Sequence, residues 1–348
     1  MKPRVYLDWN ATAPLRAESK SAMLDAMDAF GNPSSVHAEG RKAKALIEKA
    51  RAQVASALGA DGADVIFTSG ATEAASLAFG GKGLVGSDIE HDAVLSWIEP
   101  TLSADARGSV NVATPENTVL QLANSETGVV QDLPSGLFGS DVTQAFGKIP
   151  FAFNWLGCTV AIISAHKLGG PKGIGALVVK RGTDIAAQLK GGGQEMGRRA
   201  GTENITGIAG FGAAAEAAAK DLADGVWDKV VQSRDFFESY IADAANDVIF
   251  PAKGAKRLPN TSCLAVPGWK GETQVMQMDL AGYAISAGSA CSSGKVKASR
   301  VLKAYGYDDD VAASAIRVSI GPDTTKEELK GFADAWLAQK AKLRIRAA

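Results

Sequence analysis

The sequence lacks an excess of charge of either sign and contains few cysteines. Its 348 residues include 37 Lys and Arg against 38 Asp and Glu, which gives a formal net charge of -1. This balance excludes the basic surface typical of a nucleic-acid or membrane-surface binder. Three cysteines are too few for a disulfide scaffold, and their odd number is typical of a reducing compartment. We therefore expect a cytoplasmic protein without nucleic-acid or membrane partners.

Long apolar runs and metal-binding motifs are also absent. The sequence contains no run of about 18 consecutive apolar residues, the length that a helix needs to span a bilayer. The first residues, MKPRVYLDWNATAP, lack the apolar core of a signal peptide. The three histidines, His37, His91 and His166, lie far apart, and no two cysteines have C-x-x-C spacing. The sequence therefore predicts no metal site.

Helical and strand patterns alternate along most of the chain, which is typical of an α/β fold. The length suggests about two domains, and the character of the chain changes near residue 206, where two long Ala-rich helical patterns begin. We place the boundary near residue 225. Predicted helices cover 38–58, 73–79, 205–222, 226–245 and 326–342, and predicted strands cover 64–68, 118–123, 159–164, 175–179, 262–266, 284–286 and 316–320.

The sharpest local feature is Ser164-Ala-His-Lys167, which follows the predicted strand 159–164 and precedes a glycine-rich stretch. A lysine at the end of a buried strand is partly desolvated. Desolvation lowers its pKa, and the neutral amine can then form a Schiff base. The alternative is a surface lysine with its charged end in water. This stretch alone supports both interpretations equally.

Two further stretches indicate a possible cofactor site. Ser69-Gly-Ala-Thr-Glu73 lies at a strand-to-helix turn, where backbone N–H groups and hydroxyls could hold a phosphate. For this stretch alone, an ordinary helix N-cap is the simpler explanation. Asp141 ends another short apolar segment, where a buried carboxylate needs a cationic partner. A lysine that binds an aldehyde, a phosphate cradle and a carboxylate for a pyridinium nitrogen together meet the needs of pyridoxal phosphate.

The cysteines and one arginine have distinct settings. Cys291 lies among Ser, Ala and Gly residues, which is typical of an exposed, mobile loop and suits a thiol that must move. Cys158 and Cys263 lie in apolar stretches, so we expect both to be buried and structural. Arg317 lies within a strand pattern, where it either pairs with a protein carboxylate or binds the carboxylate of a substrate.

Taken in chain order, these stretches resemble the cysteine desulfurases of the NifS/IscS type, within the class V aminotransferases. The resemblance runs from Tyr6 to Thr325. Each motif alone is weak, whereas the ordered set is highly specific. The motifs are Leu7-Asp-Trp-Asn-Ala-Thr, Gly31-Asn-Pro-Ser-Ser-Val-His37, Thr68-Ser-Gly-Ala-Thr-Glu73, Glu90-His91, Asn124-Ser-Glu-Thr-Gly128, Asp141-Val-Thr-Gln144, Ser164-Ala-His-Lys167, Arg198-Arg-Ala-Gly-Thr202 and Ser286-Ala-Gly-Ser-Ala-Cys291.

The resemblance implies a role for each matched residue. It implies that pyridoxal 5'-phosphate is held through Lys167, that His91 stacks on its ring and moves protons, and that Asp141 pairs with its ring nitrogen. Cys291 is implied to carry the sulfur. Gln144 is implied to contact the phenolic oxygen of the cofactor. The residues implied to hold its phosphate are Ala71, Thr72, Ser164 and His166, together with Thr202 of the second copy in a homodimer. Asn32 and Arg317 are implied to lie near the substrate carboxylate.

Two departures from the family pattern stand out. Ser125 occupies the position of the family's asparagine that faces the phenolic oxygen, a contact for which Asn124 could compensate. The stretch from Gly128 to Asp141 is too short for the helix that relatives have there. These departures affect one cofactor contact and the usual partner surfaces.

The resemblance implies the fold of the fold-type I pyridoxal enzymes. It consists of a large domain, residues 16–225, with a mostly parallel seven-stranded sheet, and a smaller α+β domain, residues 226–348 together with 1–15. The implied reaction converts L-cysteine to L-alanine and leaves sulfur as a persulfide, which passes to an acceptor such as an iron–sulfur scaffold protein. A selenocysteine lyase, a class V aminotransferase and a catalytically idle scaffold are the alternatives.

Overall fold

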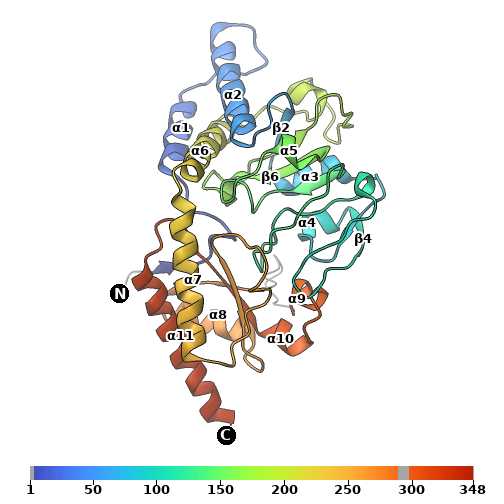
Figure 1. Ribbon diagram of the computed structural model, residues 1–348. Helices are drawn as coiled ribbons and strands as arrows, with labels where there is room; N and C mark the ends of the chain where they lie inside the picture. Colours follow the sequence, from blue (N-terminus) through green and yellow to red (C-terminus); the bar gives the residue numbers. More distant parts are fainter. Residues whose placement is uncertain (1–3, 289–297, 348) are drawn as a thin grey trace.

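The computed structural model describes residues 4–288 and 298–347 (Figure 1). Its helices are α1 (Ala17–Met27), α2 (Ala38–Ala57), α3 (Ala71–Phe79), α4 (Asp92–Leu95), α5 (Phe153–Leu156), α6 (Ile205–Ala223), α7 (Val226–Ala244), α8 (Gly271–Leu280), α9 (Arg300–Ala304), α10 (Asp309–Ser314) and α11 (Lys326–Ala347). Its strands are β1 (Val5–Tyr6), β2 (Asp64–Thr68), β3 (Leu84–Ser87), β4 (Ile98–Leu102), β5 (Gly139–Asp141), β6 (Val160–Ser164), β7 (Gly175–Val179), β8 (Thr261–Ala265), β9 (Tyr283–Ala284), β10 (Ser286–Ala287) and β11 (Ala315–Ser319).

The central sheet has the order β2-β7-β6-β5, and a separate pair, β3-β4, continues it. The extended segment 118–122 connects the two parts, because the N–H of Val119 donates to Val85 in β3 and the N–H of Leu120 donates to Gly139 in β5. This segment is the predicted strand 118–123, paired at isolated positions rather than along a continuous ladder. Strand β7 is antiparallel to both neighbours, and the other pairings are parallel. The expected mostly parallel sheet of seven strands is therefore confirmed.

Both faces of this sheet are covered, as its unbroken apolar strands predict. In β6, Val160 and Ile162 pack into the core covered by α3, whereas Ala161 and Ile163 pack into the core covered by α2 and α6. This alternation follows from the two-residue period of a strand. The strands β2, β5 and β6 run in one direction, so their carboxyl ends lie along one edge.

The chain's first strand and its last third lie below the large sheet in Figure 1 and form two further sheets. Strands β10, β11 and β8 form an antiparallel sheet, and β1 pairs with β9. In Figure 1, α7 runs down from the large sheet alongside α11, with α8 beside them. Leu7 joins a core with Trp269, Phe332 and Trp336 of this region. Among the described residues, no helix is long and apolar enough to cross a membrane.

The segment between Gly128 and β5 contains no helix, as its length predicts. It runs as extended chain: Val129 bridges to Arg257 and Val130 bridges to Ala123. The N–H of Gly136 then donates to the carbonyl of Gly157. The sheet remains continuous without the helix because segment 118–122 still pairs directly with β5.

Candidate active site

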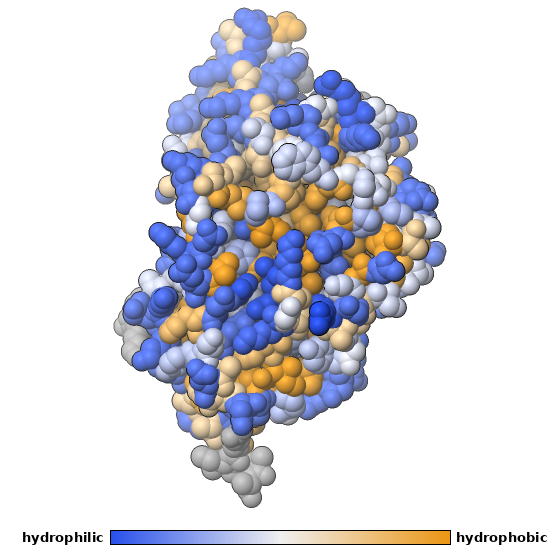
Figure 2. Space-filling view, in the orientation of Figure 1, coloured by the Kyte–Doolittle hydropathy of each residue, from blue (hydrophilic) through white to orange (hydrophobic). Residues whose placement is uncertain are grey.

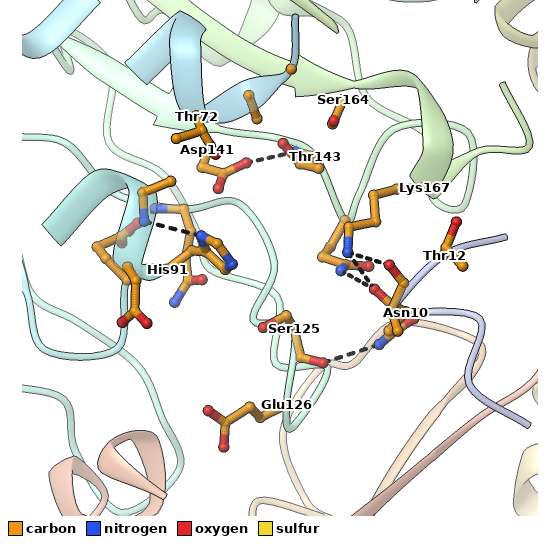
Figure 3. A pocket seen from close by; sticks show the side chains of 18 of the residues that line it. Asn10, Thr12, Thr72, His91, Ser125, Glu126, Asp141, Thr143, Ser164 and Lys167 are labelled. Carbon is orange, nitrogen blue, oxygen red and sulfur yellow. Dashed lines mark hydrogen bonds between the residues drawn. The ribbon is translucent and has the colours of Figure 1, made fainter. Parts of the chain in front are cut away.

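A cavity of about 850 Å³ opens at the carboxyl ends of β2, β5 and β6. Loops that follow these strands meet there with the N-terminal segment and with β10 and β11. Figure 3 shows how side chains from these distant segments converge. The predicted site residues that line the cavity are Ala71, Thr72, His91, Ser125, Asp141, Gln144, Ser164, His166, Lys167 and Arg317.

Lys167 lies in a short helical turn, Ala165–Lys167, directly after β6. Its Nζ donates to the carbonyls of Asn10 at 2.7 Å and Ala11 at 2.8 Å. Burial and the nearby guanidinium of Arg317 lower the pKa of this amine to about 8. The amine is therefore deprotonated more readily than that of a surface lysine, which is the condition for Schiff-base formation.

One end of the cavity is built to receive an anion. The turn before α3 presents the helix's first backbone N–H groups and the Thr72 hydroxyl. Ser164 lies nearby at the end of β6, and in Figure 3 no hydrogen bond joins either hydroxyl to another of the residues drawn. His166 contributes a buried Nδ1 that also lacks a partner within residues 4–288 and 298–347. Burial and the neighbouring Lys167 lower the pKa of His166 to about 4, so its ring is neutral.

Asp141 and His91 occupy the cavity on the side away from Lys167 (Figure 3). Asp141 ends β5, and one of its carboxylate oxygens accepts the N–H of Thr143 at 2.9 Å. His91 is the N-cap of α4, and its Nδ1 accepts the N–H of Ala93 at 3.1 Å. Because Nδ1 is an acceptor there, Nε2 carries the proton when the ring is neutral.

These groups fit pyridoxal 5'-phosphate. The amine of Lys167 suits the aldehyde, and the carboxylate of Asp141 suits a protonated ring nitrogen. The unpartnered Nδ1 of His166 and the hydroxyls of Thr72 and Ser164 are donors for phosphate oxygens. A buried polar atom without a partner is costly in a folded protein, and a bound phosphate would remove that cost here.

Arg317 meets the first of the two sequence-based alternatives. Its Nη2 donates to Asp8 at 2.7 Å, so it pairs with a protein carboxylate. Its Nη1 donates to the carbonyl of Ser125 at 3.1 Å, and its buried Nε has no partner in the part of the chain that the structure describes. The guanidinium therefore lines the cavity with a donor still available.

Among the described residues, three predicted site residues do not line this cavity. Asn124 is buried behind it, because its side-chain carbonyl accepts the N–H groups of Glu126 and Thr127 and its amide donates to Ile89. Asn32 and Thr202 are exposed on other parts of the same chain. Cys291 lies outside the described residues. The other two cysteines are buried as predicted, and burial raises the pKa of Cys158 to about 12.

Comparisons with known proteins agree on one family. The family profile Aminotransferase class-V matches residues 5–99 and 114–332. The chain is 37% identical to the cysteine desulfurase IscS of Dictyoglomus turgidum, over 94% of this chain and 92% of that protein. It is 39% identical to a cysteine desulfurase of a Frankia species, over 98% of this chain and 92% of that protein. The chain belongs to the cysteine desulfurase family.

Solved structures of this family have the same fold. A NifS-like protein from Rickettsia africae superimposes with a TM-score of 0.87 at 31% identity, covering 96% of this chain and 98% of that one. A structure described as SspA in complex with cysteine has a TM-score of 0.75 at 28% identity, covering 92% of this chain and all of that one. The α/β fold expected from the resemblance is thereby confirmed.

Within this desulfurase fold, the structure also identifies residues at or next to the cavity that the sequence analysis did not assign a role. Asn10 connects the N-terminal segment to the site: its carbonyl accepts Gln144 Nε2 at 3.0 Å as well as Lys167. Buried Lys148 donates to Gln144 Oε1 at 2.7 Å, which turns the NH₂ of Gln144 toward Asn10 and the cavity. Burial lowers the pKa of Lys148 well below its usual value. A lysine within the apolar stretch Ala145-Phe-Gly-Lys-Ile is the signal that could have identified it.

Glu126 is the other addition to the desulfurase site. Its Oε2 accepts a hydrogen bond of 2.5 Å from the hydroxyl of Ser299, which follows the segment containing Cys291. Burial raises the pKa of Glu126 to about 7, although Ser299 and Arg317 favour the charged form. Its position directly after Ser125, in the motif Asn124-Ser-Glu-Thr-Gly128, is the only sequence signal.

Proposed function

We propose that this protein is a pyridoxal phosphate-dependent cysteine desulfurase, which converts L-cysteine to L-alanine and transfers the sulfur to Cys291 as a persulfide. The observation that carries the proposal is the amine of Lys167, which has a lowered pKa and lies in a cavity with Asp141, His91 and an anion-binding turn. Family membership and the similarity to a structure described as a complex with cysteine support the substrate.

The proposed cofactor contacts follow from the positions of the side chains. Lys167 attaches the cofactor and Asp141 pairs with its ring nitrogen. Gln144 donates its NH₂ group to the phenolic oxygen, beside Ser125, because Lys148 holds the amide in that orientation. The backbone at Ala71 and the side chains of Thr72, Ser164 and His166 hold the phosphate. When bound, the cofactor is an electron sink that stabilises negative charge at the substrate Cα.

The remaining steps belong to the protein's own side chains. Arg317, with its free Nε donor, holds the substrate carboxylate. Lys167 and His91 take a proton from Cα and return one to form alanine, and both residues line the cavity. The thiolate of Cys291 attacks the sulfur of the substrate, so an S–S bond forms as the C–S bond breaks. The electron pair of the C–S bond stays with the carbon fragment, which takes up a proton to become alanine.

We also propose a homodimer. Asn32 and Thr202 are exposed and lie outside the cavity of their own chain, so they would act in the site of a second copy. Asn32 lies between Phe30 and Val36, which are 87% and 88% exposed. Apolar side chains this exposed are typical of a surface that a partner covers.

The other parts of the proposal concern organisation and setting. We propose a large cofactor domain of residues 16–225 and a smaller domain of 226–348 with 1–15; the core that Leu7 shares with Trp269 and Trp336 supports this division. We propose that the enzyme acts in the cytoplasm and passes its sulfur to an acceptor such as an iron–sulfur scaffold protein.

The test is the release of alanine and sulfide from L-cysteine in the presence of a reductant. Wild-type protein should form both, Lys167→Ala should form neither, and Cys291→Ser should bind cysteine without accumulating persulfide. A keto acid as product would instead identify an aminotransferase. A strong preference for selenocysteine, retained in Cys291→Ala, would identify a selenocysteine lyase.

A further inference from the structure

Arg300 holds the turn that contains His91 at three points. It is the first residue of α9, and its guanidinium donates to the carbonyl of Asp88 at 2.8 Å, the carbonyl of Glu90 at 2.8 Å and the carboxylate of Asp92 at 2.9 Å. These acceptors lie three residues before, one before and one after His91. Such an arrangement requires the planar, multi-donor head group of arginine.

Arg300 thereby holds the backbone before His91 and the side chain of the residue after it. His91 is the N-cap of a helix of only four residues, and its own anchor is the bond that Nδ1 accepts from Ala93. A helix this short has little stability of its own. Gln121 and Asn124 hold Ile89 and Glu90 from the sheet side, and the bonds from Arg300 hold the turn from the side of α9.

The opposite end of this contact is itself well anchored. Ser299 caps α9 by accepting the N–H of Leu302 at 3.1 Å, and its hydroxyl also donates to Glu126 in the cavity wall. The N–H of Ser299 donates to the carbonyl of Ala312. Val301 and Leu302, the next residues of α9, are buried in the core that covers the large sheet. Arg300 thus projects from a rigid support.

We propose that Arg300 is a positioning residue for the desulfurase reaction, which fixes the His91 imidazole by holding residues 88, 90 and 92 from the start of α9. The proposal rests on the role assigned to His91 in the proposed function. Arg300 lines the cavity as well, but its Nε, Nη1 and Nη2 donate to residues 88, 92 and 90, so the role we assign to it acts through His91.

The first experiment observes His91 directly. Because the chain has only three histidines, selective ¹³C labelling of the imidazoles gives few NMR signals, and His91→Gln assigns one of them. In Arg300→Ala, the His91 signal should shift and broaden, whereas those of His37 and His166 should remain in place. This readout needs no turnover, so it tests the proposal even if the reaction differs from the one proposed.

The second experiment measures alanine formation in the cofactor-loaded enzyme. Displacing a proton-transferring group by a fraction of an ångström to 1 Å costs about 10- to 100-fold in rate. We therefore expect Arg300→Ala to lower kcat at least about tenfold, while KM for cysteine changes less than about threefold. Arg300→Lys keeps the charge but not the fork, so it should resemble Arg300→Ala, and added guanidinium should partly restore Arg300→Ala.

Lys303 provides the matched control. It lies on the same helix, forms an ion pair of 2.7 Å with Asp309, and its side chain is 45% exposed, compared with 44% for Arg300. Lys303→Ala should leave the His91 signal and kcat unchanged. Equal effects of both variants, or an unmoved His91 signal in Arg300→Ala, would overturn the proposal. An inactive wild-type enzyme with a shifted His91 signal would instead overturn the proposed function and leave the positioning role intact.

Discussion

At the scale of single residues, burial changes the charge of the groups that line the cavity. The pKa of Lys167 is lowered to about 8 and that of His166 to about 4, whereas that of Glu126 is raised to about 7, in each case mainly by desolvation. Near neutral pH, Lys167 and Glu126 are therefore closer to a change of protonation than the same residues on a surface, whereas His166 stays neutral. Proton transfer at the cavity becomes easier as a result.

The assignment of Lys167 is testable by chemical trapping. Borohydride reduction of the cofactor-loaded protein, followed by peptide mapping, should place the adduct on Lys167. Among the described lysines that are buried, Lys148 is the matched comparison, because its amine also has a lowered pKa but does not line the cavity. Reduction that labels Lys148, or any other lysine, would contradict the assignment.

Asp141→Asn should separate cofactor binding from turnover. Asparagine keeps an oxygen to accept the N–H of Thr143 but loses the negative charge opposite the ring nitrogen. The variant should still bind pyridoxal phosphate, while kcat falls by roughly 10²-fold or more. Absorbance of the bound cofactor and alanine release are the measurements. Turnover near that of the wild type would show that no ion pair forms at this position.

Glu126→Gln should change the dependence of stability on pH. The raised pKa of about 7 means that the folded protein binds a proton that the unfolded chain releases above about pH 4.5. As the pH rises from about 4.5 to about 7, the wild-type protein therefore loses stability, and this loss is complete above pH 7. Glutamine does not titrate and still accepts from Ser299. At pH 8, the free energy of unfolding of the variant should exceed that of the wild type by about 2 kcal/mol. This is less than the free energy to which the full pKa shift corresponds, because the side chain partly faces the cavity.

The check is denaturant unfolding of both proteins without cofactor, at pH 4 and pH 8. The difference in unfolding free energy should disappear at pH 4. Exposed Glu116→Gln is the control, and it should give no difference at either pH. A gain that is equal at both pH values would contradict the assigned protonation.

At the scale of elements, the anion-binding turn depends on how closely it packs on strand β7. A Cβ at Gly175 would lie 2.5 Å from the carbonyl oxygen of Ile163 and 2.7 Å from the Cα of Gly70. Both neighbours are backbone atoms, so neither can move aside as a flexible side chain would. Glycine is therefore required on β7 for the start of α3 to lie at its observed place beside Ser164.

Gly175→Ala should accordingly weaken cofactor binding. Overpacking of this kind costs about 1–3 kcal/mol, and part of it should appear as displacement of the turn. We expect a lower melting temperature and a cofactor dissociation constant raised about tenfold. Gly254→Ala is the control, since nothing lies within 4 Å of the added Cβ. Unchanged cofactor affinity in Gly175→Ala would show that the turn tolerates the shift.

At the scale of the whole molecule, apolar side chains remain exposed on α1 and the loop that follows it. Leu24, Met27, Phe30 and Val36 are between 55% and 88% exposed. Figure 2 shows that elsewhere on the visible face apolar residues gather in the middle, among polar ones. A surface at residues 24–36 that holds Asn32 among apolar side chains is where we expect the second subunit.

Phe30→Asp should therefore convert the dimer into a monomer. A charge at the centre of an apolar interface is desolvated without a partner, which costs several kcal/mol. Light scattering should give twice 35.9 kDa for the wild type and 35.9 kDa for the variant. Leu280→Asp, at an equally exposed apolar residue on α8, should remain dimeric. A dimeric Phe30→Asp would place the interface elsewhere.

The sequence by itself determined the main helices and strands, although not α1, α8, β3 or β4, and it indicated many of the residues that line the cavity. Unbroken apolar runs followed by polar residues predicted β2 and β6 and the functional residues after them, because strand ends in an α/β sheet lead directly into the loops that build sites. The ordered motifs predicted the family. Local pattern was sufficient to place residues that lie at the end of their own strand or within an apolar stretch, as for Lys167, Asp141 and the buried Cys158.

The tertiary structure decided what depends on contacts between distant segments. No local pattern indicates that Asn10 accepts from Lys167, or that Arg300 holds the turn of His91 across more than two hundred residues of chain. The pairing of segment 118–122 at isolated positions is likewise set by its neighbours β3 and β5. Lowered and raised pKa values also required the structure, because desolvation is a property of everything packed around a group and not of the group's place in the sequence.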